Sequence, residues 1–106
     1  MNVQFKKGVL ELCVLVVLSS RDYYGYELVQ AISRSIDISE GTVYPLLRRL
    51  TQVGYFSTYI RESGEGPARK YYRITDTGRE HQTRLLAEWT RFVRDVNTLI
   101  GKKEST

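Results

Sequence analysis

The chain has 106 residues, of which 42% are hydrophobic, and this is enough for one small domain with a single core. Its one cysteine, Cys13, excludes a disulfide within the chain, so the composition permits a reducing compartment, and we expect a cytoplasmic protein. The formal net charge of +4 favours an acidic partner, and a chain this short often gains stability by forming an oligomer.

The first predicted element is a helix over about residues 6–19. The run from Leu12 to Leu18 is apolar throughout, so we expect this helix to be buried on more than one side. Glu11 interrupts the apolar stretch, no cleavage site follows it, and it is too short to span a bilayer. We therefore predict neither a signal peptide nor a membrane partner. The second apolar side of the helix needs another element or another subunit.

A second and a third helix follow, joined by a short turn. Residues 21–24 are a predicted turn, and residues 25–36 a helix whose inward apolar residues are Leu28, Val29, Ile32 and Ile36. Ser39 is placed to cap the third helix by accepting a hydrogen bond from the Thr42 amide. Two helices in this order, the second with a basic face, are typical of a helix-turn-helix.

The third helix has two unlike sides. Its apolar residues, spaced three or four apart, are Val43, Leu46, Leu47, Leu50 and Val53. The opposite side gathers Gly41, Tyr44, Pro45, Arg48 and Gln52, with Arg49 beside them. Arginine can pair with guanine in the major groove and glycine lets the backbone approach a phosphate, so this side is predicted to bind DNA. A surface helix with solvated charges is the alternative that this segment alone leaves open.

A β-hairpin is predicted after the third helix, which Gly54 ends. Residues 55–60 and 69–75 are rich in aromatic and β-branched residues, and the turn cluster at 63–68 joins them. A helix-turn-helix followed directly by a hairpin is a winged helix-turn-helix. The basic residues of the returning strand are expected to contact phosphates, which position the protein without reading sequence: Arg69, Lys70 and Arg73.

The last predicted helix begins after a cap at Thr75 or Asp76 and runs to about Ile100. Its apolar residues recur every three or four positions over about four turns and need a partner, for which a second copy of the chain is the simplest choice. The predicted fold class is mainly α with a small β-hairpin. Residues 1–75 form a winged helix-turn-helix domain, residues 76–101 a C-terminal dimerisation helix, and residues 102–106 a tail.

Three segments resemble the PadR family of bacterial transcriptional regulators: Tyr24-Gly-Tyr-Glu-Leu28, Glu40-Gly-Thr-Val-Tyr-Pro-Leu-Leu-Arg-Arg-Leu50 and Arg69-Lys-Tyr-Tyr-Arg-Ile-Thr-Asp-Thr-Gly78. The resemblance places Ser39, Gly41, Thr42, Tyr44, Pro45, Arg48 and Arg49 on a recognition helix, and Arg69 and Lys70 on the wing. It implies a repressor that binds pseudo-palindromic operator DNA. Because a single helix follows the wing, the chain resembles the short subfamily.

The same resemblance implies a homodimer in which the last helix packs against the first helix of the partner. The first helix would then be part of both the domain and the dimer interface. The interface residues are predicted to be Leu12, Val16, Leu85, Trp89, Phe92, Val93, Val96, Leu99 and Ile100.

Some short relatives bind flat aromatic compounds between the subunits, stacked on a tryptophan of the last helix. Trp89 stands at the matching place, Leu86 and Phe92 lie one turn to either side, and Leu12 would approach from the first helix. The resemblance thus implies a small aromatic effector, whereas packing between subunits is the other role open to Trp89. The chain is expected to be apolar where some relatives have an acidic residue near the tryptophan, which leaves the class of ligand open.

Catalysis and metal binding have little support in the sequence. His81 is the one histidine and is expected to be a solvated surface residue, and no Cys/His cluster has zinc spacing. Gly64-Glu-Gly-Pro67 lacks the Lys-Ser/Thr of a phosphate-binding loop. We predict no catalytic residue, no metal and no cofactor. The alternative function is a winged-helix protein-interaction module that no longer binds DNA.

Overall fold

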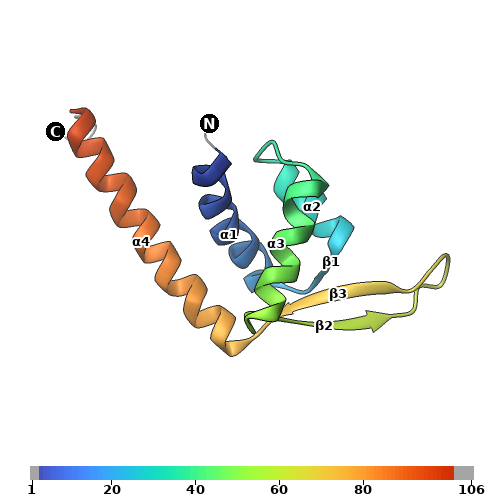
Figure 1. The fold of residues 1–106 in the computed structure, drawn as a ribbon. Helices are drawn as coiled ribbons and strands as arrows, with labels where there is room; N and C mark the ends of the chain where they lie inside the picture. The colour runs from blue at the N-terminus through green and yellow to red at the C-terminus, as the bar shows by residue number, and fades with distance from the viewer. Residues whose placement is uncertain (1–2, 102–106) are drawn as a thin grey trace.

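The computed structural model describes residues 3–101, with side chains from residue 8 onward; the predicted tail at 102–106 lies outside them. In this range the elements are α1 (Val3–Ser20), β1 (Tyr23–Tyr24), α2 (Gly25–Ser33), α3 (Glu40–Gln52), β2 (Phe56–Arg61), β3 (Arg69–Ile74) and α4 (Asp76–Ile100) (Figure 1). The fold is mainly helical with a small antiparallel sheet, which confirms the predicted class. None of the helices in the described part of the chain has the length and apolarity that a membrane span requires.

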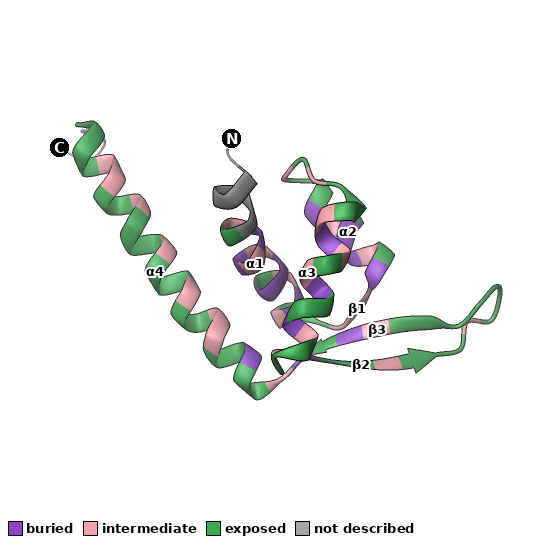
Figure 2. Ribbon diagram, viewed as in Figure 1, coloured by how far each residue is buried: buried purple, intermediate pink, exposed green. Residues whose placement is uncertain are grey.

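The core lies where α1, α2 and α3 meet one face of the sheet. Its buried side chains are Leu10, Val14, Leu15 and Leu18 of α1, Leu28, Val29 and Ile32 of α2, Val43, Leu47 and Leu50 of α3, and Phe56, Tyr72 and Ile74 of the sheet. Figure 2 shows the corresponding buried stretches facing one another across the three helices. The three- and four-residue spacing of apolar residues therefore identified the inner sides of α2 and α3, except at Val53, which follows the last residue of α3 and is 53% exposed.

The sheet has three antiparallel strands in the order β1-β3-β2, one more than the predicted hairpin. The turn expected over residues 21–24 is wrong for its last two residues, which form a strand: Tyr23 pairs with Tyr72 and Tyr24 with Tyr71. Without β1, one edge of β3 would expose unpaired backbone groups, and tyrosine is a residue type that suits a strand. The pairing joins residues far apart in the chain, so no local pattern predicts it.

One helix boundary and one capping hydrogen bond also differ from prediction. α2 ends at Ser33 rather than Ile36, although the Ile36 amide still donates to the Ile32 carbonyl at 2.9 Å. Ser39 precedes α3, but its hydroxyl does not cap the Thr42 amide and lies 3.3 Å from the Thr42 hydroxyl. The Ser39 carbonyl accepts from that amide instead, at 3.1 Å, which leaves the hydroxyl on the exposed end of α3.

The wing consists of β2, β3 and the loop at 62–68, and a tight turn joins it to α3. Gly54 has φ +91°, a left-handed conformation that glycine adopts without strain. Its amide donates to the Thr51 carbonyl (3.1 Å) and the Tyr55 amide donates to the Leu50 carbonyl (3.0 Å), which is the Schellman pattern of a helix C-terminus. The prediction that Gly54 ends the third helix is confirmed, and the turn holds the wing beside α3.

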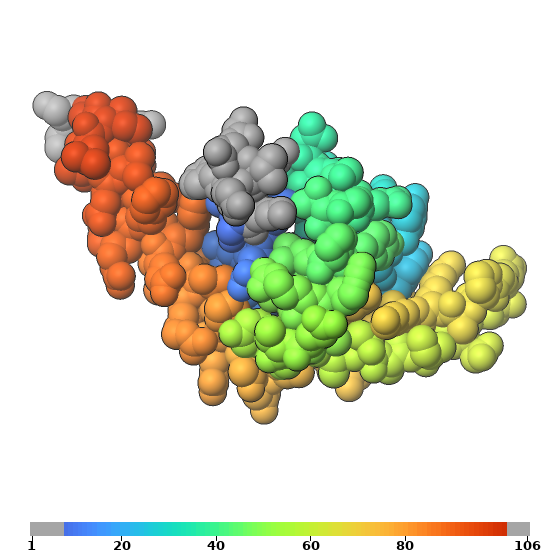
Figure 3. Space-filling view, in the orientation of Figure 1, coloured from blue at the N-terminus to red at the C-terminus, as the bar shows by residue number. Residues whose placement is uncertain are grey.

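α4 is fastened at its first turn and then leaves the body of the molecule. The Thr75 hydroxyl accepts from the Gly78 amide at 3.0 Å, which confirms the first of the two predicted caps. A Cβ at Gly78 would lie 2.2 Å from the Tyr55 carbonyl oxygen, so this close packing requires glycine. Beyond Gly78 no described residue of α4 is buried, and Figure 3 shows its C-terminal turns projecting from the packed surface.

Candidate nucleic-acid interface and interhelical cavity

A groove of about 340 Å³ separates the exposed side of α3 from the wing. Its lining residues are Tyr44, Arg48, Thr51 and Gln52 of α3 and Lys70 and Tyr72 of β3. Burial raises the pKa of the Tyr44 phenol, and nearby Glu40 adds to the shift, so the hydroxyl remains a donor at neutral pH. Two cations and two phenols therefore converge in a groove with no acidic lining residue, which suits phosphates and the acceptor edges of bases.

The exposed N-terminus of α3 extends this surface. Ser39 and Gly41 are both exposed there. A Cβ at Gly41 would meet only the Ser39 hydroxyl oxygen, at 3.7 Å, so the packing of the protein does not require glycine at this position. An open helix N-terminus is a favourable place for a phosphate, because its backbone amides and the helix dipole both attract negative charge.

The two arginines of α3 lie on different sides of the helix. Arg48 lines the groove beside the wing, whereas Arg49 Nη2 donates to Glu11 Oε1 of α1 at 2.9 Å. Thr42, Pro45 and Arg49 line a separate hollow of about 260 Å³ next to Leu10 of α1. Successive residues on a helix are about 100° apart, so one arginine points toward the wing and the next toward α1. Arg48 is consequently the arginine that faces the groove.

The cations predicted on the wing lie on opposite faces of the sheet. Lys70 faces the groove, and Arg69 and Arg73 alternate with it along β3, so they face the other way. The Arg69 guanidinium lies 4.5 Å from the centre of the Tyr24 ring, and that of Arg73 lies 4.9 Å from the centre of the Tyr59 ring. The structure therefore does not bring Arg69 and Arg73 together with Lys70.

The prediction from the sequence did not include one further cation of the wing, Arg61. Arg61 of β2 pairs in register with Arg69, and its guanidinium lies 4.7 Å from the centre of the Tyr71 ring. Asp22 accepts a hydrogen bond from Arg73 Nε at 3.3 Å and so offsets part of the positive charge on this outer face. The alternation of residues along β2 would have revealed Arg61 only if the register of the hairpin had been known.

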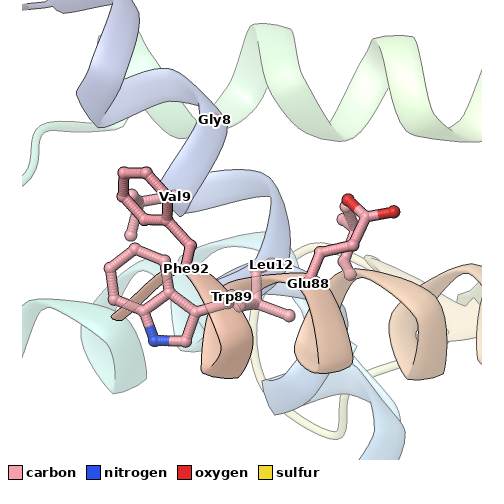
Figure 4. Close-up of a pocket in the computed structure, with 7 residues that line it drawn as sticks. Gly8, Val9, Leu12, Glu88, Trp89 and Phe92 are labelled. Carbon is pink, nitrogen blue, oxygen red and sulfur yellow. The ribbon is translucent and has the colours of Figure 1, made fainter. Parts of the chain in front are cut away.

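A larger cavity, of about 520 Å³, lies between α1 and α4 (Figure 4). Its lining residues are Gly8, Val9 and Leu12 of α1 and Leu85, Glu88, Trp89 and Phe92 of α4. The centres of the Trp89 and Phe92 rings are 6.4 Å apart, and both rings are turned toward Val9 in Figure 4. Three of the predicted ligand residues thus meet at one cavity, while Leu86 does not line it. The expectation that the surroundings of Trp89 are apolar is wrong, because Glu88 also lines the cavity.

A polar cluster joins α1, α3 and α4 at Glu11. Its carboxylate accepts from Arg49 at 2.9 Å and lies 2.7 Å from His81 Nε2. Burial acts to raise the pKa of Glu11, but the hydrogen bonds from Arg49 and His81 outweigh it and hold the pKa below the usual value. The prediction that His81 is a solvated surface residue is wrong, because the packing of α4 turns its ring against Tyr55, with ring centres 4.2 Å apart.

The fold and the groove agree with one family of proteins. The family model described as transcriptional regulator PadR-like family matches residues 14–84, which is more than half of the chain. This chain belongs to the PadR-like family of transcriptional regulators. The predicted family and the winged-helix fold are therefore confirmed, and this PadR-like protein is a DNA-binding regulator of transcription rather than an enzyme.

Individual relatives of this PadR-like regulator agree in sequence and in structure. The transcriptional regulator Rv3488 of Mycobacterium tuberculosis is 34% identical over 94 residues, which cover 85% of this chain and 87% of the relative. The crystal structure of the PadR-like transcriptional regulator BC4206 from Bacillus cereus matches with a TM-score of 0.84 and 37% identity, covering 94% of this chain and 99% of that one. The structure of smu.1704 from Streptococcus mutans matches with a TM-score of 0.83 and 35% identity, covering 91% and 90%.

Proposed function

We propose that this PadR-like regulator is a homodimeric repressor that binds pseudo-palindromic operator DNA through α3 and the wing. The observation that carries the proposal is the groove in which Arg48 and Lys70 converge without an acidic lining residue. Arg48 reaches base edges in the major groove, where a paired arginine–guanine contact contributes about 1–3 kcal/mol of discrimination, and Lys70 reaches phosphates. The protein acts in the cytoplasm, the compartment that holds the DNA it regulates.

The other proposed DNA contacts divide by their place in the fold. Contacts at the exposed start of α3 and on its α1 side come from Ser39, Gly41, Thr42, Pro45 and Arg49, and they hold the helix against the phosphates that border the major groove. Tyr44 donates its phenolic hydroxyl from the groove. Arg69 and Arg73 face away from α3, so in this proposal they reach only phosphates beyond the wing.

The apolar stripe of α4 supports the homodimer. Phe92, Leu99 and Ile100 are 51%, 87% and 70% exposed, and Val16 of α1 is exposed as well. Soluble monomers rarely leave a large apolar patch in water, and α4 packed against α1 of a second copy would cover this one. The proposed interface also includes Trp89, Val93 and Val96, together with Leu85, which the chain covers in part, and Leu12, which is 8% exposed.

A small hydrophobic or aromatic ligand between the subunits is the proposed signal for release. The cavity of about 520 Å³ falls within the usual size of small-molecule sites, and it has two aromatic walls and one carboxylate, Glu88. A ligand that favours one spacing of α1 and α4 changes the distance between the two recognition helices of the dimer. Half-sites one DNA turn apart, about 34 Å, tolerate little change, so DNA affinity falls by linkage.

The DNA-binding proposal is tested with Arg48→Ala and fluorescence anisotropy on a double-stranded DNA selected from a random pool. Wild type is expected to bind with an affinity that falls steeply as salt rises, and Arg48→Ala to lose about 1–3 kcal/mol of sequence discrimination. Arg94→Ala removes the same charge from the exposed surface of α4 and is the control. Unchanged discrimination in Arg48→Ala would refute the groove assignment. Failure of wild type to bind any DNA at low salt would favour the protein-interaction module instead.

The ligand proposal is tested through Trp89, the one tryptophan of the chain. Planar aromatic compounds are expected to quench its fluorescence and, at the same concentrations, to release the selected DNA. Glu88→Gln distinguishes ligands by charge, because it should lower the affinity for cationic compounds more than the affinity for neutral ones. Quenching without any loss of DNA binding would contradict a regulatory role for the cavity.

A further inference from the structure

Glu11 of α1 binds both the recognition helix and α4. Its Oε1 accepts from Arg49 of α3 at 2.9 Å, and its Oε2 lies 2.7 Å from His81 Nε2 of α4. The Glu11 and His81 side chains are only 19% and 16% exposed, whereas the Arg49 side chain is 55% exposed. The covered part of this cluster is thus the carboxylate with its histidine, and the part that faces solvent is an arginine of the recognition helix.

The His81 ring is oriented so that it donates to Glu11. Arg84 Nη2 lies 3.4 Å from His81 Nδ1 and can only donate, so Nδ1 is the acceptor and Nε2 carries the proton directed at Glu11. The Tyr55 ring stacks on the imidazole with an angle of 12° between the planes. Because Tyr55 directly precedes β2, the ring is held by the base of the wing as well as by α4.

α4 carries this contact together with one wall of the cavity. Its start is tied to the α3–wing junction, since the Thr75 hydroxyl donates to the Gly54 carbonyl at 2.7 Å. Leu85 lies one helical turn beyond His81 and lines the cavity, as does Leu12, the neighbour of Glu11 on α1. The cavity and the Glu11–His81 contact thus lie between the same two helices, about one helical turn apart along α4.

We propose that Glu11 is a positioning residue for DNA binding, which shares its carboxylate between Arg49 and His81 so that the place of α4 sets how freely Arg49 reaches DNA. While His81 donates, the charge of the carboxylate is shared between two donors, so Glu11 holds Arg49 less strongly than it would with Arg49 as its remaining donor. When α4 moves away, Arg49 is the remaining donor, its charge-assisted hydrogen bond tightens, and the guanidinium is withdrawn from DNA phosphates. The inference rests on the proposed function and gives ligand-induced release a route from the cavity to α3.

Two substitutions in this cluster are expected to change DNA affinity in opposite directions. Glu11→Gln removes the charge that holds Arg49, so affinity for double-stranded DNA rises about two- to fivefold, the size expected from releasing one partly exposed ion pair. His81→Ala leaves Arg49 as the remaining donor to Glu11, so affinity falls by a similar factor. A purely structural role for Glu11 would predict a fall in both variants. Fluorescence anisotropy at low salt measures the affinities, and circular dichroism with sedimentation confirms folding and assembly.

Three further variants complete the test. His81→Gln supplies an amide donor in place of Nε2 and is expected to keep affinity close to wild type. Glu80→Gln makes the same change of charge at an exposed neighbouring residue and is the matched control, expected to leave affinity unchanged. In an Arg49→Ala background, the effects of Glu11→Gln and His81→Ala vanish, because both act through Arg49.

The outcomes separate this inference from the proposed function. A fall in affinity for folded Glu11→Gln, or an effect that persists in the Arg49→Ala background, overturns the role of Glu11. If DNA binding of wild type depends on Arg48, but the effects of Glu11→Gln and Arg49→Ala on DNA affinity are not coupled, only the role of Glu11 is overturned. Wild type that binds no DNA overturns the proposed function itself, and the inference with it.

Discussion

The helical body and the α4 arm of this regulator differ in how they cover their apolar side chains. In the body, α1, α2, α3 and the sheet enclose a core whose apolar side chains are almost completely buried. Along α4, by contrast, Gly78 is the only buried residue in the described part of a 25-residue helix (Figure 2). In the sequence, the apolar residues of the body helices and those of α4 recur at the same three- and four-residue spacing. The body therefore supplies its own packing, whereas the apolar side chains of α4 stay exposed within one chain and would be covered in the proposed homodimer.

The largest expected effect is on assembly, with Val96→Glu on α4. A charge placed in the proposed interface without a partner costs about 3–5 kcal/mol of association, and DNA binding that needs two half-sites is lost with the dimer. Sedimentation velocity over a range of concentrations measures the shift to monomer. Thr98→Glu adds the same charge on the side of the helix away from Val96 and should leave the dimer intact. A Val96→Glu variant that remains dimeric would refute the proposed interface.

A smaller effect on folding distinguishes the body from the arm. Leu47→Ala creates a cavity in the core, where Leu47 has no exposed surface, and should lower the free energy of unfolding by about 2–5 kcal/mol. Leu86→Ala on α4 removes the same atoms from a side chain that is exposed, and should cost less than about 1 kcal/mol. Urea denaturation at one fixed protomer concentration measures both. Equal losses would mean that the arm is as well packed as the body.

The smallest expected effect is a pH dependence where the body and the arm meet. The pKa of Glu11 lies below its usual 4.5 in the folded chain, so Glu11 adds stability above that pH, and the contribution is lost as the pH falls through the folded pKa. In the Glu11→Gln variant, the part of the pH dependence of stability that Glu11 causes should disappear. Thermal unfolding between about pH 6 and pH 3 measures the difference. Identical pH profiles for wild type and variant would show that the Glu11 cluster contributes nothing to stability.

Much of the candidate site was predictable because it depends on local periodicity. The apolar side of α3 and the basic side with Arg48 follow from a helical repeat of 3.6 residues, and Lys70 follows from its place on the strand after the turn predicted at 63–68. Arg49 shows the limit of such reasoning. It is adjacent to Arg48 in sequence, but the rotation of α3 against α1 directs it to Glu11.

Two further features were beyond the sequence because they depend on partners distant in the chain. The short strand β1 exists because Tyr23 and Tyr24 lie beside the free edge of β3, and His81 is covered because α4 packs against α1 at Glu11. Neither residue has a local pattern that distinguishes it from a turn residue or a solvated histidine.

The sequence by itself determined the order of the helices, the presence of the wing and the family, because amphipathic spacing and short motifs are properties of neighbouring residues. Only the tertiary structure decided which cations share a surface. It placed Arg48 and Lys70 in one groove, turned Arg69 and Arg73 to the outer face of the sheet, and joined Arg49 to Glu11. The physical reason is that the direction of a side chain depends on how its whole element is rotated against the others, and long-range packing alone sets that rotation.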